Sequence, residues 1–377
     1  MKYLQRMVCC ALSLAVCAGS AAAEDESLHP IKQIRYLMGT LCEITVYPPS
    51  SMDRDAADQA IAAAFAELKR IDGVMSNWNP DSELMRLNVH AGAEGNARSR
   101  IRVGDELFER LRVALEIAKQ SDGVFDPTVG PLVRAWGFLP RCQTKESCSN
   151  MSRADAIATA KQKVGWRKVS LYLETKEVEF AVPGMEVDLG GIAKGYAAER
   201  AAQVLKEHGI RAALVNLGSS SLKAVGHPPC SDRTIADCKG WVISVADPRD
   251  RRRSAARIVL HGGDSLATSG TYEHTVGKGR KRKSHLIDPF TGEALGGKAS
   301  VSVICSDAEL ADGLTKPFIL RRDLTSPYAS KLLNTYGQCS VSRTAVQNAR
   351  LARQFLKLRN AQVDGIPEYW RDPAPDR

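Results

Sequence analysis

The sequence predicts an α+β fold in which pairs of neighbouring strands alternate with separate helices. Residues 169–173 and 178–182 alternate apolar and polar on either side of the polar segment 174–177, which indicates a hairpin. Apolar residues at helical spacing predict helices over 55–73 and 105–119. Adjacent strands that are interrupted by helices favour α+β over a doubly wound parallel sheet.

The remaining elements follow from the same periodicities. A strand is expected over 41–47, and Ser152 is a suitable N-cap for a helix over 154–164. A helix over 193–208 should end at Gly209, a residue type common after helices. Further strands are predicted over 212–217, 241–246, 256–261 and 299–305, and a basic helix that packs against the body over 345–362.

Residues 1–23 have the pattern of a secretory signal peptide. Lys2 and Arg6 precede a short apolar run, and Ala21 and Ala23 favour cleavage before Glu24. Lipidation at Cys17 is the alternative, because the preceding residues loosely resemble a lipoprotein box. Removal of the segment lowers the formal charge of the 377-residue chain from +9 to +7. We therefore expect an exported, periplasmic protein, either soluble or anchored at the inner membrane, for which nucleic acid is not a partner.

Seven cysteines follow the signal peptide. Cys142 with Cys148, and Cys230 with Cys238, each bracket a short polar segment, so both pairs are interpreted as disulfides within loops. A metal site is the weaker alternative, because neither pair has a two-residue gap or nearby histidines. Cys42 and Cys305 lie in apolar runs and are expected to be buried packing residues.

Two loops contain residues suited to binding a flat ring. Trp78 lies in the polar segment 75–84, where an indole either stacks on a ligand or pins the loop to the body. Residues 123–132 combine two prolines and two glycines with Asp126 and Thr128, a composition that fixes one loop shape. That segment is either a binding loop or an ordinary rigid turn.

Residues 187–196 form a glycine-rich turn where a strand leads into a helix. Glycines let a phosphate approach the main chain, the helix start offers free N–H groups, and Lys194 adds a positive charge. The segment matches neither the dinucleotide fingerprint nor the mononucleotide loop, so a phosphate site and a plain turn are equally supported.

Two further segments contain titratable groups. His285 has a side chain suited to accept a proton near neutral pH, or it is a structural histidine bonded to a carboxylate such as Asp288. On a helix, Asp312 shares a face with Glu309 and Lys316. That face could bind magnesium through oxygen ligands, or it could be solvated.

In order and spacing these segments resemble the ApbE family of flavin transferases, over residues 36–320. The strings that carry the resemblance are Phe-Asp-Pro-Thr-Val-Gly-Pro-Leu-Val from Phe125, Asp-Leu-Gly-Gly-Ile-Ala-Lys-Gly-Tyr from Asp188, and His-x-Ile-Asp-Pro-x-Thr-Gly from His285. The resemblance implies an α+β transferase domain, here expected over 24–330, with a C-terminal extension over 331–377.

The resemblance also implies roles for individual residues. FAD would be the substrate and Mg²⁺ its usual companion, with His285 as the general base. Residues expected to contact FAD are Met38, Trp78, Phe125, Asp126, Thr128, Asp188 and Lys194. The residues matching the metal ligands are Gly191 through its carbonyl, Asp312 and Thr315.

One position departs from the family pattern. The family places a metal-binding threonine four residues after the aspartate, where this chain has Lys316, and Thr315 comes one residue early. A shift of one residue on a helix turns a side chain by about 100°. Either the Lys316 ammonium occupies part of the magnesium site, or an irregular helix lets Thr315 still bind.

The reaction implied by the resemblance moves the FMN half of FAD onto a threonine or serine of another protein and releases AMP. The chain contains no copy of the family's acceptor motif, so the acceptor should be a separate protein, such as a membrane redox subunit. Two alternatives keep the pocket: an FAD pyrophosphatase, and a non-catalytic FAD-binding protein. The basic run 278–283 is either a solvated loop or a surface that attracts FAD phosphates or an acidic partner.

Overall fold

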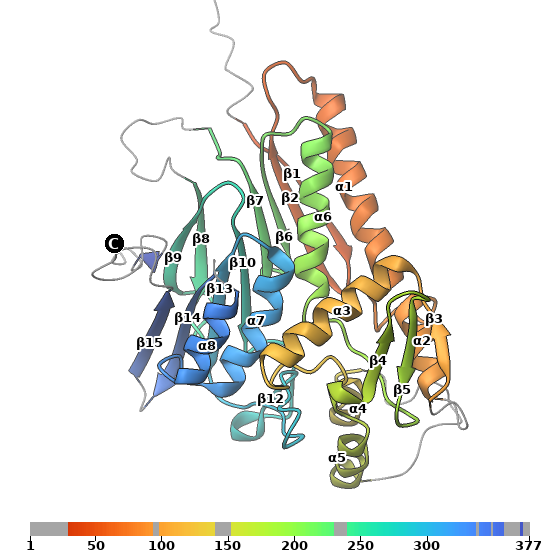
Figure 1. The fold of residues 1–377 in the computed structure, drawn as a ribbon. Coiled ribbons are helices and arrows are strands. Elements are labelled where there is room, and N and C mark those ends of the chain that lie inside the picture. The colour runs from red at the N-terminus through yellow and green to blue at the C-terminus, as the bar shows by residue number, and fades with distance from the viewer. Residues whose placement is uncertain are drawn as a thin grey trace, which may run out of the picture.

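The structure is a computed structural model, and it describes residues 29–92, 98–139, 152–229, 240–336, 339–347, 350–357 and 370–371 (Figure 1). The predicted signal peptide and the cysteine pairs 142/148 and 230/238 lie outside these residues.

One large antiparallel sheet organises the fold. Its order is β1-β2-β6-β7-β10-β13-β14-β15, and each strand pairs antiparallel with its neighbours. The bounds are β1 Ile31–Leu37, β2 Thr40–Tyr47, β6 Ala212–Leu217, β7 Ser221–Val225, β10 Ser265–Gly270, β13 Ala299–Cys305, β14 Ser340–Gln347 and β15 Arg350–Lys357.

Helices cover one face of this sheet (Figure 1). They bury the alternate strand residues that point toward them, for example Val215 on β6 and Val303 on β13. The helices of this layer are α1 Arg54–Met75, α3 Asp105–Gln120, α6 Ala193–Glu207, α7 Ala308–Arg321 and α8 Pro327–Thr335. The predicted α+β class is therefore confirmed.

The other face of the sheet packs on a smaller one made of β8 Trp241–Ala246, β9 Ser254–Leu260 and β16 Trp370–Arg371. Leu222, Leu266 and Ile304 of the large sheet contact this layer. Because successive strand residues point to opposite faces, Ile304 packs here while Val303 packs under the helices.

A peripheral part follows α1 and carries two of the predicted loops. It contains α2 Glu83–Gly92, β3 Arg100–Arg102, α4 Gly130–Trp136, α5 Arg153–Gln162, the 3₁₀ helix Trp166–Lys168, and the hairpin β4 Val169–Tyr172 with β5 Glu177–Phe180. A short hairpin, β11 Thr275–Val276 and β12 Lys283–Ser284, encloses the 3₁₀ turn Gly279–Lys281.

Local predictions were confirmed where local chemistry decides structure. Ser152 caps α5 by accepting a hydrogen bond from the Asp155 amide, and α6 ends just before Gly209, whose φ is +82°. The β1–β2 turn uses Met38 and Gly39, both at positive φ, as two-residue hairpins require.

One prediction from sequence was wrong, and one cysteine has a partner that the sequence did not indicate. The basic helix over 345–362 is wrong, because the chain there forms the end of β14 and then β15. The exposed edge of β13 offers unpaired backbone groups, and pairing with them outweighs a weak helical pattern. Cys305 is buried as expected, and it forms a disulfide with Cys339, which lies just before β14.

Cys42 is the free cysteine of the described residues, and burial raises the pKa of its thiol to about 11. Such a thiol stays protonated at neutral pH and acts as an apolar packing group. Within the described part of the chain, no helix is both long and apolar enough to cross a membrane.

Candidate functional site

The predicted site segments meet where α6 begins and α7 passes its midpoint. The Asp188 amide donates to the Pro127 carbonyl at 2.7 Å, which joins the 123–132 loop to the glycine turn. The Gly195 amide donates to Asp312 Oδ2 at 3.1 Å, which joins the start of α6 to α7. Both contacts connect segments far apart in sequence, so tertiary folding assembles this region.

The Lys316 ammonium lies between α7 and the glycine turn. Its Nζ donates to the Gly191 carbonyl at 2.8 Å, to the Asp312 carbonyl at 2.9 Å and to Asp312 Oδ1 at 2.5 Å. An ammonium has three N–H donors, so these three oxygens use all of them. Burial lowers the pKa of Lys316, and the neighbouring Asp312 carboxylate opposes that shift.

Gly191 allows this close approach. A Cβ at that position would come within 2.8 Å of the Phe125 ring and 3.4 Å of the Lys316 side chain. Gly195 has the same role where α6 crosses α7, because a Cβ there would meet the Ala308 carbonyl oxygen at 2.1 Å. The glycines thus permit close packing of the turn against α7.

Thr315 uses its hydroxyl in hydrogen bonds within the protein. Its buried hydroxyl donates to the Asp312 carbonyl at 2.7 Å and lies 2.7 Å from the Ser269 hydroxyl on β10. No cluster of three or more His, Cys, Asp or Glu side chains suited to a metal occurs in the described residues. The three oxygens expected to hold magnesium therefore do not form one open site, since Lys316 occupies the space between Gly191 and Asp312.

Asp126 and Thr128 hold the shape of their own loop. Asp126 Oδ1 accepts from the Thr128 amide at 2.8 Å and its hydroxyl at 2.6 Å, and Oδ2 accepts from the Trp166 amide at 2.9 Å. The Thr128 hydroxyl also accepts from the Gly165 amide at 2.7 Å. Burial raises the pKa of Asp126. These polar atoms already have partners, and direct contact with a ligand stays a prediction.

Asp188 and Lys194 flank the glycine turn. Asp188 Oδ1 accepts from the Gly190 amide at 2.7 Å, and the Asn77 side chain is hydrogen-bonded to the same carboxyl group. Burial raises the pKa of Asp188. Lys194 forms no ion pair with any residue that the structure describes, and its charge acts on Asp188, His285 and Lys316. It is therefore available to an anionic ligand.

His285 is near enough to Lys194 and Lys316 for their charges to lower its pKa. Its Nδ1 is 3.3 Å from the Glu273 carbonyl, and its ring meets that of His274 edge to face at 5.3 Å between centroids. A carbonyl only accepts, so this contact favours the tautomer protonated at Nδ1 and leaves a lone pair on Nε2. Burial, then the charges of His274 and Lys194, lower the pKa of His285 to about 3.

This depressed pKa predicts an unusual pH profile. Protonation of His285 removes the lone pair that a base needs. The FMN transfer that the family resemblance implies should therefore be lost only as the pH falls toward about 3, rather than through 6.5. We expect kcat/KM, which reports the free enzyme, to stay flat from pH 7 to about pH 5. Circular dichroism at each pH would separate inactivation from unfolding. An acid limb centred near 6.5 would contradict the assignment.

Met38 and Phe125 pack against the main core, whereas Trp78 extends into solvent. Phe125 is 4% exposed and lies under Gly191, and Met38 is partly buried in the β1–β2 turn. Trp78 is 64% exposed, and its neighbour Asn77 contacts Asp188. An exposed indole at the rim of an otherwise packed site has a face free for stacking.

Replacing Trp78 by alanine should weaken FAD binding by about 5- to 150-fold, because stacking of a base on an aromatic ring contributes roughly 1–3 kcal/mol. Quenching of flavin fluorescence measures the dissociation constant. Trp78→Phe is the matched control, since it keeps an aromatic face, and it should retain most of the affinity. Equal affinities for the wild type and the alanine variant would remove Trp78 from the site.

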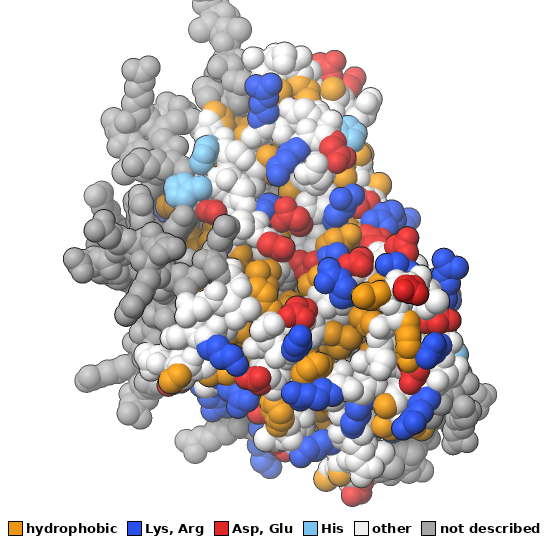
Figure 2. Space-filling model, in the orientation of Figure 1, with side chains coloured by type: hydrophobic (Ala, Val, Ile, Leu, Met, Phe, Trp, Pro, Cys, Tyr) orange, Lys and Arg blue, Asp and Glu red, His pale blue; other side chains and the backbone are white. Residues whose placement is uncertain are grey.

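The basic run 278–283 is partly used by the protein itself. Arg282 Nε donates to the Thr275 hydroxyl at 3.0 Å, and Lys283 lies 3.7 Å from Glu293. On the face drawn in Figure 2, Lys and Arg side chains are interspersed with acidic ones.

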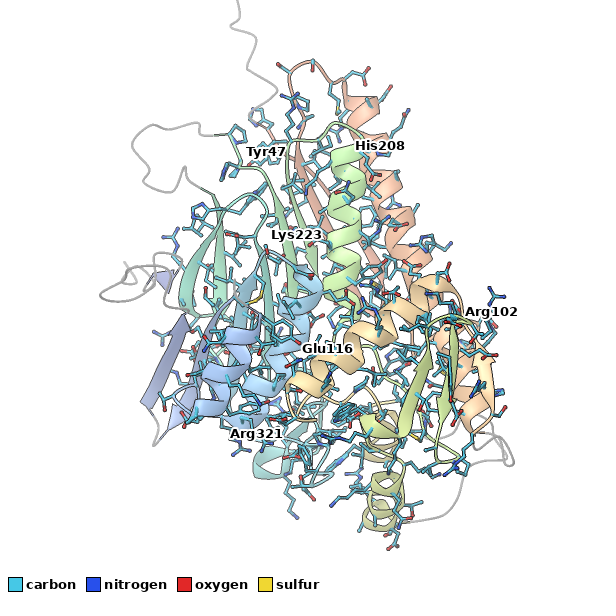
Figure 3. All side chains as sticks on the ribbon, viewed as in Figure 1. Tyr47, Arg102, Glu116, His208, Lys223 and Arg321 are labelled. Carbon is cyan, nitrogen blue, oxygen red and sulfur yellow. A yellow bond between two sulfur atoms is a disulfide. The ribbon has the colours of Figure 1, made fainter. Side chains whose placement is uncertain are left out.

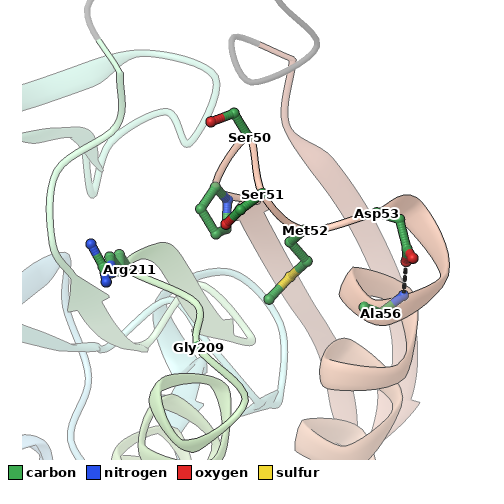
Figure 4. Close-up of a pocket in the computed structure, with 8 residues that line it drawn as sticks. Ser50, Ser51, Met52, Asp53, Ala56, Gly209 and Arg211 are labelled. Atoms are coloured by element: carbon green, nitrogen blue, oxygen red, sulfur yellow. Dashed lines mark hydrogen bonds between the residues drawn. The ribbon is translucent and has the colours of Figure 1, made fainter.

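A hollow lies at the end of α6 opposite to Lys194 (Figure 4). It encloses about 600 Å³ between the loop that precedes α1 and the loop that follows α6. Asp53 points into α1 as its N-cap, accepting from the Ala56 amide at 2.7 Å. None of the predicted site residues lines it, and we assign it no function.

The structure adds residues that the sequence did not identify as part of the site. Asn77 contacts Asp188, and its Oδ1 is buried with no hydrogen-bond partner among the described residues. His274 packs on His285, and Ser269 orients Thr315. Their positions depend on strand pairing and loop docking, and no spacing in the sequence indicates either.

The chain is similar to known proteins over most of its length. The sequence pattern of the ApbE family matches residues 38–332. The FAD:protein FMN transferase of Klebsiella pneumoniae is 31% identical over 279 residues, covering 73% of this chain and 74% of that protein. The protein of the same name from Treponema pallidum is 30% identical over 325 residues, covering 83% and 84%.

Solved structures show the same fold. The ApbE protein of Thermotoga maritima superposes with a TM-score of 0.69 at 27% identity, covering 86% of this chain and 97% of that one. The flavin transferase ApbE of Vibrio cholerae gives a TM-score of 0.68 at 22% identity, covering 87% and 97%. Sequence and fold agree: this chain belongs to the ApbE family.

Proposed function

We propose that this protein is an FAD:protein FMN transferase, which moves the FMN half of FAD onto a threonine or serine hydroxyl of a separate acceptor protein. The relatives that bear this name are about 30% identical over most of their length. The observation that supports the chemistry best is that His285 is buried, with Nδ1 3.3 Å from the Glu273 carbonyl, and is near enough to Lys194 for that charge to help lower its pKa.

In this reaction the acceptor oxygen forms a bond to the phosphorus of the FMN half, and the bond from that phosphorus to the bridging oxygen breaks. AMP leaves with the bridging oxygen. His285 Nε2 takes the hydroxyl proton, while Nδ1 stays bonded to the Glu273 carbonyl. The Lys194 charge offsets the negative charge of the pyrophosphate, and positioning contributes much of the remaining acceleration.

The flavin would lie at the rim, where Trp78 offers a stacking face beside Asn77 and Asp188. The phosphates would lie near the glycine turn and the start of α6, because the Lys194 side chain there has no ion-pair partner within the described chain. Asp126 and Thr128 would contribute by fixing the adjoining loop through their buried hydrogen bonds.

One incubation separates this function from its two alternatives. The purified protein is mixed with FAD and an acceptor peptide of the form Asp-x-x-(Ser/Thr)-Gly-Ala-(Ser/Thr), and the products are resolved by mass spectrometry. A peptide heavier by FMN, together with AMP, supports transfer. Free FMN with AMP indicates a pyrophosphatase, and unchanged FAD that co-purifies with the protein indicates a binding protein.

We also propose that the protein works outside the cytoplasm, in the periplasm. The predicted signal peptide and the Cys305–Cys339 disulfide support this location, since structural disulfides persist in oxidising compartments. An acceptor at the membrane, such as a redox subunit, would be reached from that side. Mass spectrometry of the mature N-terminus distinguishes cleavage before Glu24 from lipidation at Cys17.

A further inference from the structure

We propose that the Lys316 ammonium is a built-in cation that replaces a divalent metal between Gly191 and Asp312, so that this chain needs no Mg²⁺. The family resemblance places a metal among the Gly191 carbonyl, the Asp312 carboxylate and a hydroxyl on α7. The inference rests on the proposed function for its catalytic part only, because metal binding can be measured without any flavin chemistry.

The ammonium has the contacts expected of a cation built into this position. Three protein oxygens, all within 2.9 Å of Nζ, accept its three N–H donors. The second carboxylate oxygen of Asp312 is held by the Gly195 amide and by the Ser221 hydroxyl at 3.3 Å. Asp312 therefore bridges Lys316 and the start of α6, as a metal-binding carboxylate would bridge an ion and its supporting shell.

A magnesium ion cannot share this space. Mg²⁺ requires near-octahedral oxygen ligands at about 2.0–2.1 Å. Nζ already lies at hydrogen-bond distance from both the Gly191 carbonyl and Asp312 Oδ1, so an ion bound to these oxygens would overlap the ammonium. The Thr315 hydroxyl already has two partners in the protein, because it donates to the Asp312 carbonyl and lies 2.7 Å from the Ser269 hydroxyl on β10.

The charge balance explains what the lysine does for the reaction. Lys316 and Asp312 form a neutral pair, whereas a magnesium ion beside Asp312 would leave a positive charge. Lys316 can thus tie the glycine turn to α7 as a metal would, but the positive charge facing a pyrophosphate has to come mainly from Lys194. Its ammonium is close enough to influence Lys316 and His285.

The first test measures metal binding without flavin. Mn²⁺ is titrated into the wild-type protein and into Lys316→Thr, and free Mn²⁺ is followed by electron paramagnetic resonance. We expect no binding at this site in the wild type. A new site should appear in the variant, where a hydroxyl replaces the ammonium at the fourth position after Asp312. Lys331→Thr, the same exchange on the exposed surface of α8, is the matched control and should bind no more than the wild type.

The second test uses the transfer assay with and without chelator. The transfer rate of the wild type should change less than about twofold in EDTA. The transfer rate of Lys316→Thr should fall at least about tenfold in EDTA and recover when Mg²⁺ is added, a dependence typical of metal ligands. Recovery by Mg²⁺ is a response that a purely structural lysine would not produce. Circular dichroism and FAD affinity check that the variant is folded.

The outcomes separate the two proposals. Mn²⁺ bound stoichiometrically by the wild type, or a wild-type rate that falls tenfold in EDTA, would overturn the lysine proposal and leave FMN transfer standing. Absence of transfer under every metal condition would overturn the proposed function, while the Mn²⁺ titration would still decide the role of Lys316. If Lys316→Thr does not fold, the two wild-type measurements suffice for that decision.

Discussion

Replacing His285 by alanine should lower the rate of FMN transfer by about 10²–10⁴-fold, the usual contribution of a positioned general base. FAD affinity should stay within about threefold of the wild type, because the ring accepts a proton from the acceptor hydroxyl and is not assigned a contact with the flavin. Single-turnover transfer to the acceptor peptide and a separate fluorescence titration with FAD measure the two quantities.

His208→Ala is the matched control for this variant. His208 also places Nδ1 near a backbone carbonyl, that of Val204 at 2.9 Å, but it lies exposed at the end of α6 far from Lys194 (Figure 3). Its replacement should leave transfer unchanged. Wild-type rates in His285→Ala would show that another group, or water, takes the proton, and the base would have to be reassigned.

Replacing both Cys305 and Cys339 by serine should lower the free energy of unfolding by about 4 kcal/mol, the value that loop-closure entropy gives for a sequence separation of 34 residues. The bridge joins the end of β13 to the residue before β14, so its loss frees the strand that continues the sheet beyond β13. Urea unfolding of the oxidised proteins, followed by circular dichroism, measures the difference.

Reduction provides the control for this prediction. Dithiothreitol should destabilise the wild type by more than the double substitution does, because it also reduces the disulfides predicted for the pairs 142/148 and 230/238. The difference between the two oxidised proteins therefore isolates the 305–339 bridge. A further loss of stability in the reduced variant would show that disulfides between other cysteines also contribute. Equal midpoints for oxidised wild type, reduced wild type and variant would show that the 305–339 bridge adds no stability.

The local elements were predictable because their signals are local. A serine at an N-cap, a glycine after a helix, and alternating residues beside a polar turn each favour one conformation, whatever the rest of the chain does. The helices α1, α3, α5 and α6 and the β4–β5 hairpin therefore lie where the sequence predicts them. The three strings from Phe125, Asp188 and His285 likewise sufficed to indicate the family.

The C-terminal strands and the disulfide were not predictable in this way. Residues 345–362 carry apolar side chains at helical spacing, but β13 presents an edge that the chain can pair with, and β14 and β15 form there instead. Cys305 and Cys339 lie in different elements, so their pairing depends on how β13 and β14 are placed. Both are decided by contacts across long sequence separations.

Periodicity and short strings are local signals, and they are enough to indicate the α+β class, the family and the residue types of the candidate site. Which of these residues meet depends on the folded arrangement. The folded chain engages Asp126 and Thr128 in hydrogen bonds that fix the shape of their loop. It leaves Lys194 without an ion pair among the described residues, and it brings the Lys316 ammonium to the Gly191 carbonyl. The physical reason is that hydrogen-bond partners and charge neighbours are set by packing between distant segments, which no local pattern specifies.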